Sequence, residues 1–268
     1  MGFSRDDLPV IPNLPRDLNS LLVRDLFSLA IQPILDLRTG DAFTGEALAR
    51  LDHPEHGAIP VEVFTSLLDA AGLYSEFDLY IFRKCCLWLQ RTEMEGKRFD
   101  RLFCNFSRRT LSRQGIAGDL IRIADSCGVP CRKLGIEITE CRQSEDMKQM
   151  TENLKELKAA GFLIILDDYG SGVTCEKDLQ SFPLDIVKLD QSLLQKAAGD
   201  GREAFRVQAA DLARRGIEVV CEGIETEEQD TLAREAGCRF GQGYLYFTPV
   251  PQEWVLELIR QARNQNYD

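Results

Sequence analysis

Acidic, amide and lysine side chains stand at or near the ends of short apolar runs, and these residue types have the potential for chemistry. They are Glu46, Asn105, Glu137, the adjacent pair Asp167 and Asp168, Lys188 with Asp190, Glu222 with Glu225, and Gln242. Carboxylate and amide oxygens are hard ligands that suit Mg²⁺ or Mn²⁺. Two adjacent aspartates can serve two metals through one bridging carboxylate, and paired metals roughly 3.5–4 Å apart suit the hydrolysis of a phosphodiester.

Other catalytic apparatus is missing from the sequence. The only two histidines, His53 and His56, lie in one loop-like stretch, and no G-x-S-x-G motif accompanies them. Neither G-x-x-x-x-G-K-[ST] nor G-x-G-x-x-G occurs, so the usual nucleotide-binding loops are absent. Acid–base chemistry is therefore left to carboxylates and lysine.

Charge and composition exclude several classes of protein. The chain has 268 residues, with 32 Lys and Arg against 43 Asp and Glu, a net charge of −11. This acidity argues against binding to a DNA or RNA polymer through bulk charge. No apolar run is long enough for a membrane span, and residues 1–15 lack the pattern of a signal peptide. Nine scattered cysteines predict reduced thiols and a cytoplasmic protein.

Short apolar runs alternate with amphipathic stretches along the chain. The runs expected to be strands are Phe27–Ile34, Phe43–Ala49, Leu102–Phe106, Leu134–Ile138, Phe162–Leu166, Asp185–Leu189, Ile217–Cys221 and Phe240–Tyr246. The stretches expected to be helices are Val61–Ala71, Glu76–Gln90, Ala117–Cys127, Ser144–Ala160, Arg202–Arg215, Thr226–Ala236 and Gln252–Ala262. This alternation favours a closed parallel α/β barrel. An open doubly wound sheet is the alternative, but the sequence lacks the Gly-rich first turn of that fold.

In such a barrel the carboxyl ends of the strands meet on one face, where active sites lie. Each polar residue alone is most simply a helix cap, a turn or a solvated charge. The joint pattern is harder to dismiss, because successive strands each deliver a polar group to the same expected face. A ring of carboxylates would repel itself, and divalent cations would resolve that repulsion.

An ordered set of eight motifs makes the chain resemble the EAL domain family of cyclic di-GMP phosphodiesterases over residues 25–255. The motifs are Gln32-Pro33-Ile34, Glu46-Ala47-Leu48-Ala49-Arg50, Asn105-Phe106-Ser107, Glu137-Ile138-Thr139-Glu140, Asp167-Asp168-Tyr169-Gly170, Val187-Lys188-Leu189-Asp190, Glu222-Gly223-Ile224-Glu225-Thr226 and Gln242-Gly243-Tyr244. The resemblance implies a TIM-like (β/α)8 barrel whose early strand runs antiparallel to the rest.

The resemblance also implies roles for individual residues. The metal ligands, for what are expected to be two Mg²⁺ or Mn²⁺ ions, would be Glu46, Asn105, Glu137, Asp167, Asp168 and Glu222. Lys188 would orient the attacking water, Glu222 is a second candidate for handling its proton, and Glu46 belongs with them in catalysis. Substrate contacts would come from Gln32, Leu48, Arg50 and Gln242, with Glu140 and Glu225 in support.

The expected reaction is hydrolysis of one phosphodiester bond of cyclic di-GMP, a bacterial second messenger, to 5′-pGpG. The expected division is an N-terminal extension over residues 1–24, with one short helix, and an EAL domain over residues 25–265. The family often dimerises, which makes a homodimer a candidate assembly.

Two alternatives stay open. A slow or inactive EAL protein could act as a cyclic di-GMP receptor or a protein-binding regulator; the loop from Val173 to Glu176 departs from the family pattern, and Glu176-Lys177-Asp178 replaces a more apolar stretch. An unrelated metal-dependent barrel enzyme would share the acids but would have no reason to carry the first two motifs.

Overall fold

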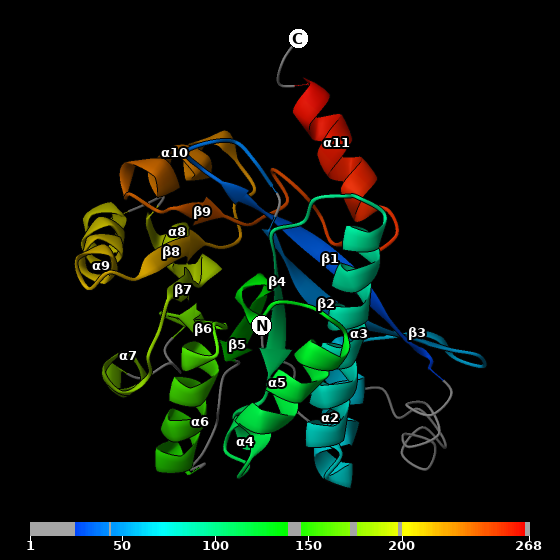
Figure 1. Ribbon diagram of the computed structural model, residues 1–268. Coiled ribbons are helices and arrows are strands. Elements are labelled where there is room, and N and C mark those ends of the chain that lie inside the picture. Colours follow the sequence, from blue (N-terminus) through cyan, green and yellow to red (C-terminus); the bar gives the residue numbers. More distant parts are fainter. Residues whose placement is uncertain (1–24, 43, 139–145, 172–175, 198–199, 266–268) are drawn as a thin grey trace.

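The computed structural model of the chain is an α/β barrel, described here for residues 25–42, 44–138, 146–171, 176–197 and 200–265. The barrel strands are β1 (Phe27–Asp36), β2 (Thr44–His53), β4 (Arg101–Phe106), β5 (Leu134–Ile138), β6 (Leu163–Tyr169), β7 (Ile186–Leu189), β8 (Glu218–Cys221) and β9 (Phe240–Gly241). Each strand is hydrogen-bonded to the next in this order, and β9 returns to pair with β1 (Figure 1). The expected closed barrel is therefore confirmed.

Strand β1 runs in the opposite direction to the other strands of the barrel. It runs antiparallel to β2, with Gln32 opposite Glu46, and antiparallel to β9, with Leu35 opposite Gly241. The pairs from β2 through β4, β5, β6, β7 and β8 to β9 are parallel. The expected antiparallel early strand is thus confirmed. Two short strands, β3 (Gly57–Ile59) and β10 (Val250–Pro251), extend β2 and β1 at the rim.

Helices connect the strands and cover the outside of the barrel (Figure 1). They are α2 (Val61–Ala71), α3 (Tyr74–Met94), α4 (Arg108–Leu111), α5 (Ile116–Ser126), α6 (Met147–Ala159), α7 (Glu176–Ser181), α8 (Gln191–Ala197), α9 (Arg202–Arg214), α10 (Glu227–Glu235) and α11 (Val255–Gln265), with a 3₁₀ turn at Cys131–Lys133. Among the described residues, no helix combines the length and the apolar character that crossing a membrane requires.

Side-chain alternation along the strands divides the apolar residues into two clusters. The larger cluster fills the space between the strands and the helices. The smaller cluster consists of Ile34, Phe103, Ile165, Ile186, Val220 and Phe240, one from each of six barrel strands. Because neighbouring side chains on a strand point to opposite faces, this second cluster occupies the barrel interior. It forms an apolar floor beneath the site.

The structure differs from the sequence-based expectation at the last strand. Only Phe240 and Gly241 are extended, and Gln242 begins a tight turn instead of lying inside the strand. The turn is closed by backbone hydrogen bonds with Ile224, which donates to the Gln242 carbonyl and accepts from Leu245. These bonds occupy the backbone groups that a longer strand would need. Helices α4, α7 and α8 were not expected, because segments of four to seven residues show too little periodicity.

The expected extension over residues 1–24 lies outside the described residues, as do Phe43 and the segment 139–145 that contains Glu140.

Candidate active site

A layer of polar side chains lies directly above the apolar floor of the barrel. On β7, Lys188 follows the floor residue Ile186 by two positions, so both side chains lie on the same face of the strand. The same spacing relates the floor residues of β4, β6, β8 and β9 to Asn105, Asp167, Glu222 and Gln242. On the antiparallel strand β1 the order is reversed, and Gln32 precedes its floor residue by two positions. The reversed direction of β1 therefore still delivers a polar group to the shared layer.

Lys188 lies at the centre of this layer and is only 1% exposed. Its Nζ is within ion-pair distance of four carboxylates: Glu137 Oε1 at 2.6 Å, Glu222 Oε1 at 2.6 Å, Glu46 Oε2 at 2.9 Å and Asp167 Oδ1 at 3.3 Å. An ammonium group has three N–H donors, so the four acceptors use all of its capacity. One buried cation thus draws together acids from β2, β5 and β6 and the acid that directly follows β8.

Glu46 is the second hub of the layer. Its Oε1 accepts a hydrogen bond from Asn105 Nδ2 at 2.8 Å, and its Oε2 accepts one from Gln242 Nε2 at 2.8 Å. Gln242 Nε2 also donates to Gln32 Oε1 at 3.1 Å, and Gln32 Nε2 donates to the Phe247 carbonyl at 3.1 Å. This chain of hydrogen bonds joins Gln32 and Glu46, from the early strands β1 and β2, to Gln242, which follows the last barrel strand.

The ionisable side chains of the layer shift the pKa values of their neighbours. Burial alone would lower the pKa of Lys188, but the surrounding carboxylates raise it well above its ordinary value. Burial alone would raise the pKa of Glu46, yet Lys188 and the amide donors of Gln242 and Asn105 bring it below its ordinary value. Burial and the neighbouring acids raise the pKa of Glu137 well above normal.

Glu222 is partly buried, and its pKa rises to about 8 because desolvation and the acids nearby outweigh the attraction of Lys188. The layer therefore holds more carboxylates than its one ammonium group can neutralise. A cation placed there would relieve this excess.

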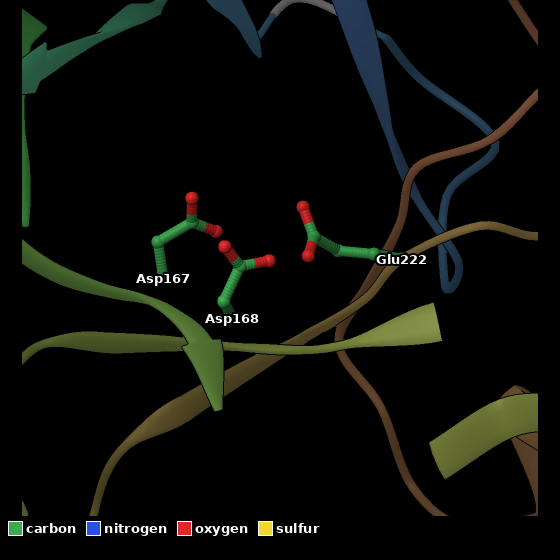
Figure 2. A group of neighbouring side chains, drawn as sticks. All are labelled: Asp167, Asp168 and Glu222. Carbon is green, nitrogen blue, oxygen red and sulfur yellow. The ribbon is translucent and has the colours of Figure 1, made fainter. Parts of the chain in front are cut away.

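Three of these acids form a group that could hold a metal ion. Asp167 and Asp168 at the end of β6, and Glu222 after β8, each offer a carboxylate oxygen, and these oxygens lie within 4.8 Å of one another. Figure 2 shows the three carboxyl groups turned toward a shared space. Asp168 adopts a left-handed backbone conformation with φ of 51°, which is uncommon for a residue other than glycine.

The donor set fits a divalent cation. Within the described part of the chain, Glu137 Oε2 and Gln242 Oε1 are buried oxygens without a hydrogen-bond donor. A buried carboxylate oxygen left unmatched is costly, and a hard cation is the partner it suits. The oxygen-only composition of Glu46, Asn105, Glu137, Asp167, Asp168 and Glu222 favours Mg²⁺ or Mn²⁺ over softer metals.

Two cavities open beside the layer. The first has a volume of about 270 Å³ and is lined by Gln32, Asp168, Glu222, Glu225, Gln242 and Tyr244, among others. The second has a volume of about 250 Å³, and its wall includes Glu46, Leu48, Arg50 and Asn105 together with the apolar residues Phe64 and Phe77. Gln242 in the wall of the first cavity is hydrogen-bonded to Glu46 in the wall of the second, so both cavities border the polar layer.

A family model described as "EAL domain" matches residues 15–249. The chain belongs to the EAL domain family. Among curated proteins, this EAL domain is similar to "Cyclic di-GMP phosphodiesterase NbdA" of Pseudomonas aeruginosa, with 29% identity over 252 residues, which are 93% of this chain and 32% of the relative. It is also similar to "Cyclic di-GMP phosphodiesterase PdeL" of Escherichia coli, with 29% identity over 250 residues, 91% of this chain and 69% of the relative. The chain spans only about a third of the first curated relatives that it matches.

Solved structures agree on the fold. The structure "PaMucR Phosphodiesterase, c-di-GMP complex" superposes with a TM-score of 0.81 at 26% identity, covering 90% of this chain and 98% of that one. The cAMP- and cyclic-di-GMP-bound form of the EAL enzyme Bd1971 superposes with a TM-score of 0.84 at 24% identity, covering 92% of this chain and 68% of that one.

Most residues expected in the site of this EAL domain are brought together. One connected group contains Gln32, Glu46, Asn105, Glu137, Asp167, Asp168, Lys188, Glu222 and Gln242. Leu48 and Arg50 lie apart from it in the second cavity, where Arg50 Nη1 donates to the Ala49 carbonyl at 2.9 Å. Glu225 lines the first cavity, and Glu140 is outside the described residues. The individual roles of these residues stay predictions.

Sequence reasoning gave no role to a buried polar cluster behind Asn105. Asp78, on the apolar face of α3, accepts hydrogen bonds through Oδ2 from Ser107 N at 3.0 Å, Ser107 Oγ at 2.9 Å and Thr110 Oγ1 at 2.6 Å. Burial raises the pKa of Asp78 to about 6, although these donors act to lower it. An acid between apolar residues at helical spacing, here Phe77 and Ile81, was the signal available in the sequence.

Proposed function

We propose that this EAL domain hydrolyses one phosphodiester bond of cyclic di-GMP to give 5′-pGpG, with Mg²⁺ or Mn²⁺ in the polar layer of the barrel. The observation that carries the proposal is the gathering of five carboxylates and Asn105 around Lys188 at one end of the barrel. The names of the relatives NbdA and PdeL support the choice of substrate.

The metals would be held by Glu46, Asn105, Glu137, Asp167, Asp168 and Glu222. When bound there, divalent cations would neutralise a phosphodiester and lower the pKa of a water molecule. This charge is necessary, because an acidic chain would otherwise repel a dinucleotide that carries two phosphates.

The side chains of the layer would orient the reactants. Lys188 contacts four carboxylates in this structure; once those carboxylates hold cations, an N–H donor of Lys188 released from them would orient the attacking water. Glu222 faces both Lys188 and the aspartate pair, so it is the second candidate to accept the proton of that water. Glu46 would hold its metal-binding orientation through its bonds to Asn105 and Gln242.

The substrate would lie across the two cavities. Gln32 and Gln242 line the first cavity, and Leu48 and Arg50 line the second, so each cavity offers contacts for one nucleoside half. The Arg50 guanidinium carries a positive charge and several donors that suit a phosphate or a guanine edge. The first cavity also presents Tyr244, whose side chain is exposed.

The direct test is to incubate the purified chain with cyclic di-GMP and Mg²⁺ or Mn²⁺, with and without EDTA, and to separate 5′-pGpG by chromatography. Glu137→Gln should remove turnover, whereas Glu235→Gln, which removes the same charge from an exposed position on α10, should not. Product formation that persists in EDTA would contradict the metal-dependent mechanism.

The receptor alternative makes a different prediction in the same experiment. It rests on the departure from the family pattern at residues 173–176, of which only Glu176 lies among the described residues. Tight binding of cyclic di-GMP without any product, in Mg²⁺ and in Mn²⁺, would favour the receptor over the enzyme. Neither binding nor turnover would contradict both.

A further inference from the structure

A buried ion pair links two segments that follow different strands of the barrel. Arg108 begins α4 and Asp178 lies in α7, and both are less than 10% exposed. Their contact is bidentate, with Nη1 to Oδ1 at 3.1 Å and Nη2 to Oδ2 at 2.7 Å. The guanidinium also lies over the Phe182 ring, 5.6 Å from its centroid. Such a fork-to-fork contact fixes orientation as well as distance.

The pair spans an intervening strand. Arg108 comes three residues after Asn105 on β4, and Asp178 comes ten residues after Asp168 on β6. Strands β4 and β6 are not neighbours in the barrel, because β5 lies between them. The ion pair therefore joins the segments after two strands that both carry proposed metal ligands, and it does so across the end of a third strand.

One end of this link is firmly anchored. Helix α4 is held from α3 by Asp78, which accepts the hydrogen bond of Ser107 N. It is held from α6 by Asn153, whose Nδ2 donates to the Leu111 carbonyl at 2.7 Å and the Arg113 carbonyl at 2.9 Å. The ion pair thus ties α7 to a fixed point.

The other end lies downstream of a strained residue. Asp168 has a φ of 51°, and a residue other than glycine keeps this conformation only where its surroundings enforce it. The β6–β7 register shifts between Leu166 and Tyr169, so regular pairing does not secure Asp168 itself. Beyond it, Ser171 N donates to the Asp168 carbonyl at 3.2 Å. Tyr169, the residue after Asp168, donates through Oη to Glu176 Oε2 at the start of α7 at 3.4 Å, so the position of α7 is a further constraint on this short segment.

We propose that the Arg108–Asp178 ion pair is a positioning device that keeps the Asp168 carboxylate in its metal-binding place by tying α7 to α4. The inference rests on the metal site of the proposed function. A buried ion pair is seldom the most stabilising way to fill a protein interior, since apolar residues of similar volume often serve as well or better. The directional contact is what an apolar pair would lack.

The test compares Arg108→Met, Asp178→Leu and the double variant. Three quantities are measured: the thermal midpoint, the Mn²⁺ dissociation constant by electron paramagnetic resonance, and deuterium uptake of the peptide that covers residues 167–171. The matched control is Arg109→Ala, which removes the neighbouring arginine and its half-exposed ion pair with Asp69.

Each single variant should lower the thermal midpoint, increase deuterium uptake at residues 167–171 and weaken Mn²⁺ binding by about 10- to 100-fold, the range typical for residues that support metal ligands. The double variant should regain the thermal midpoint but keep the weak Mn²⁺ binding and the raised uptake. Arg109→Ala should change none of the three.

Recovery of Mn²⁺ affinity together with stability in the double variant would overturn the proposal, because the pair would then be only structural. Unchanged uptake and affinity in the single variants would overturn it as well. If the unmodified chain binds no Mn²⁺, the proposed function fails; deuterium uptake at residues 167–171 then decides separately whether the pair holds this segment.

Discussion

Replacing Lys188 with methionine should show what a single buried ammonium group contributes to this barrel. Methionine keeps an unbranched, flexible side chain but removes the charge and all three donors. Four carboxylates, from Glu46, Glu137, Asp167 and Glu222, now lie within 2.6–3.3 Å of Lys188 Nζ. In the variant they would face one another without that cation.

The expected loss of unfolding free energy follows from this burial. Removing one partner of a buried ion pair costs about 3–5 kcal/mol, because the remaining charge is left uncompensated. The acids of the variant would take up protons more readily when folded than when unfolded. Their folded pKa values would exceed the unfolded ones, so the variant is most stable at low pH and loses stability as the pH rises through the folded pKa values. The loss should therefore be larger at pH 8 than at pH 5.5.

Added metal should offset part of the loss. A ligand that binds only the folded state at 100 times its dissociation constant contributes about 2.7 kcal/mol. Mn²⁺ at that concentration should therefore restore a large share of the stability of Lys188→Met, and EDTA should remove the gain. Turnover should not return, since the orienting donor is missing.

The assay is urea unfolding at pH 5.5 and pH 8, with Mn²⁺ or EDTA. The control is Lys97→Met, which removes an exposed lysine paired with Glu95 and should leave the unfolding midpoint unchanged. A loss at pH 8 below about 1 kcal/mol, the scale of a surface ion pair, would refute the idea that Lys188 holds the acids together. A loss equal at both pH values would refute the electrostatic cause.

Four further substitutions test other parts of the structure. The pKa of Asp78 is raised from its ordinary 3.8 to about 6. Its contribution to the free energy of unfolding is therefore greatest below pH 3.8 and falls as the pH rises through 6. Asp78→Asn should abolish this pH dependence of the unfolding free energy. Its full size is about 3 kcal/mol, because one unit of pKa difference corresponds to 1.36 kcal/mol. Urea unfolding at pH 4 and pH 7 measures most of it. Glu46→Ala should lower 5′-pGpG formation by about 100-fold or more while circular dichroism shows a retained fold, because Lys188 keeps its other carboxylates. A Cβ on Gly243 would lie 2.1 Å from the Ile224 carbonyl oxygen, so Gly243→Ala should lower the unfolding free energy by about 1–3 kcal/mol. Gly118→Ala, in the interior of α5 and near only the end of the Arg122 side chain, should instead raise it by about 0.5–1 kcal/mol.

Local patterns in the sequence were sufficient for the barrel and for placing most of the polar strand-end residues at one end of it. Runs such as Leu134–Ile138 and Ile217–Cys221 are short, apolar and bounded by turn residues, and they became β5 and β8 with little change of bounds. A polar residue two positions beyond an apolar one on a strand shares its face whatever the rest of the chain does. The acids at the strand ends could therefore be assigned to one layer in advance.

The sequence overestimated regular structure where distant backbone groups compete. Phe240–Tyr246 is apolar enough for a strand, yet only its first two residues are extended, because Ile224 captures the backbone groups of Gln242 and Leu245. That competition arises from a segment eighteen residues earlier, and no local pattern records it. The short helices α4 and α7 escaped notice for a related reason, since tertiary contacts hold them.

The sequence by itself determined which side chains this protein can use: carboxylates, amides and one lysine at the ends of barrel strands. Only the tertiary structure decided which of them touch. That Lys188 meets four acids at once, that Gln32 joins Gln242 from the antiparallel strand, and that Arg108 reaches Asp178 across β5 all depend on strand register and barrel closure. Strand pattern is a local property of the chain, whereas register and closure are set by packing between residues far apart in it.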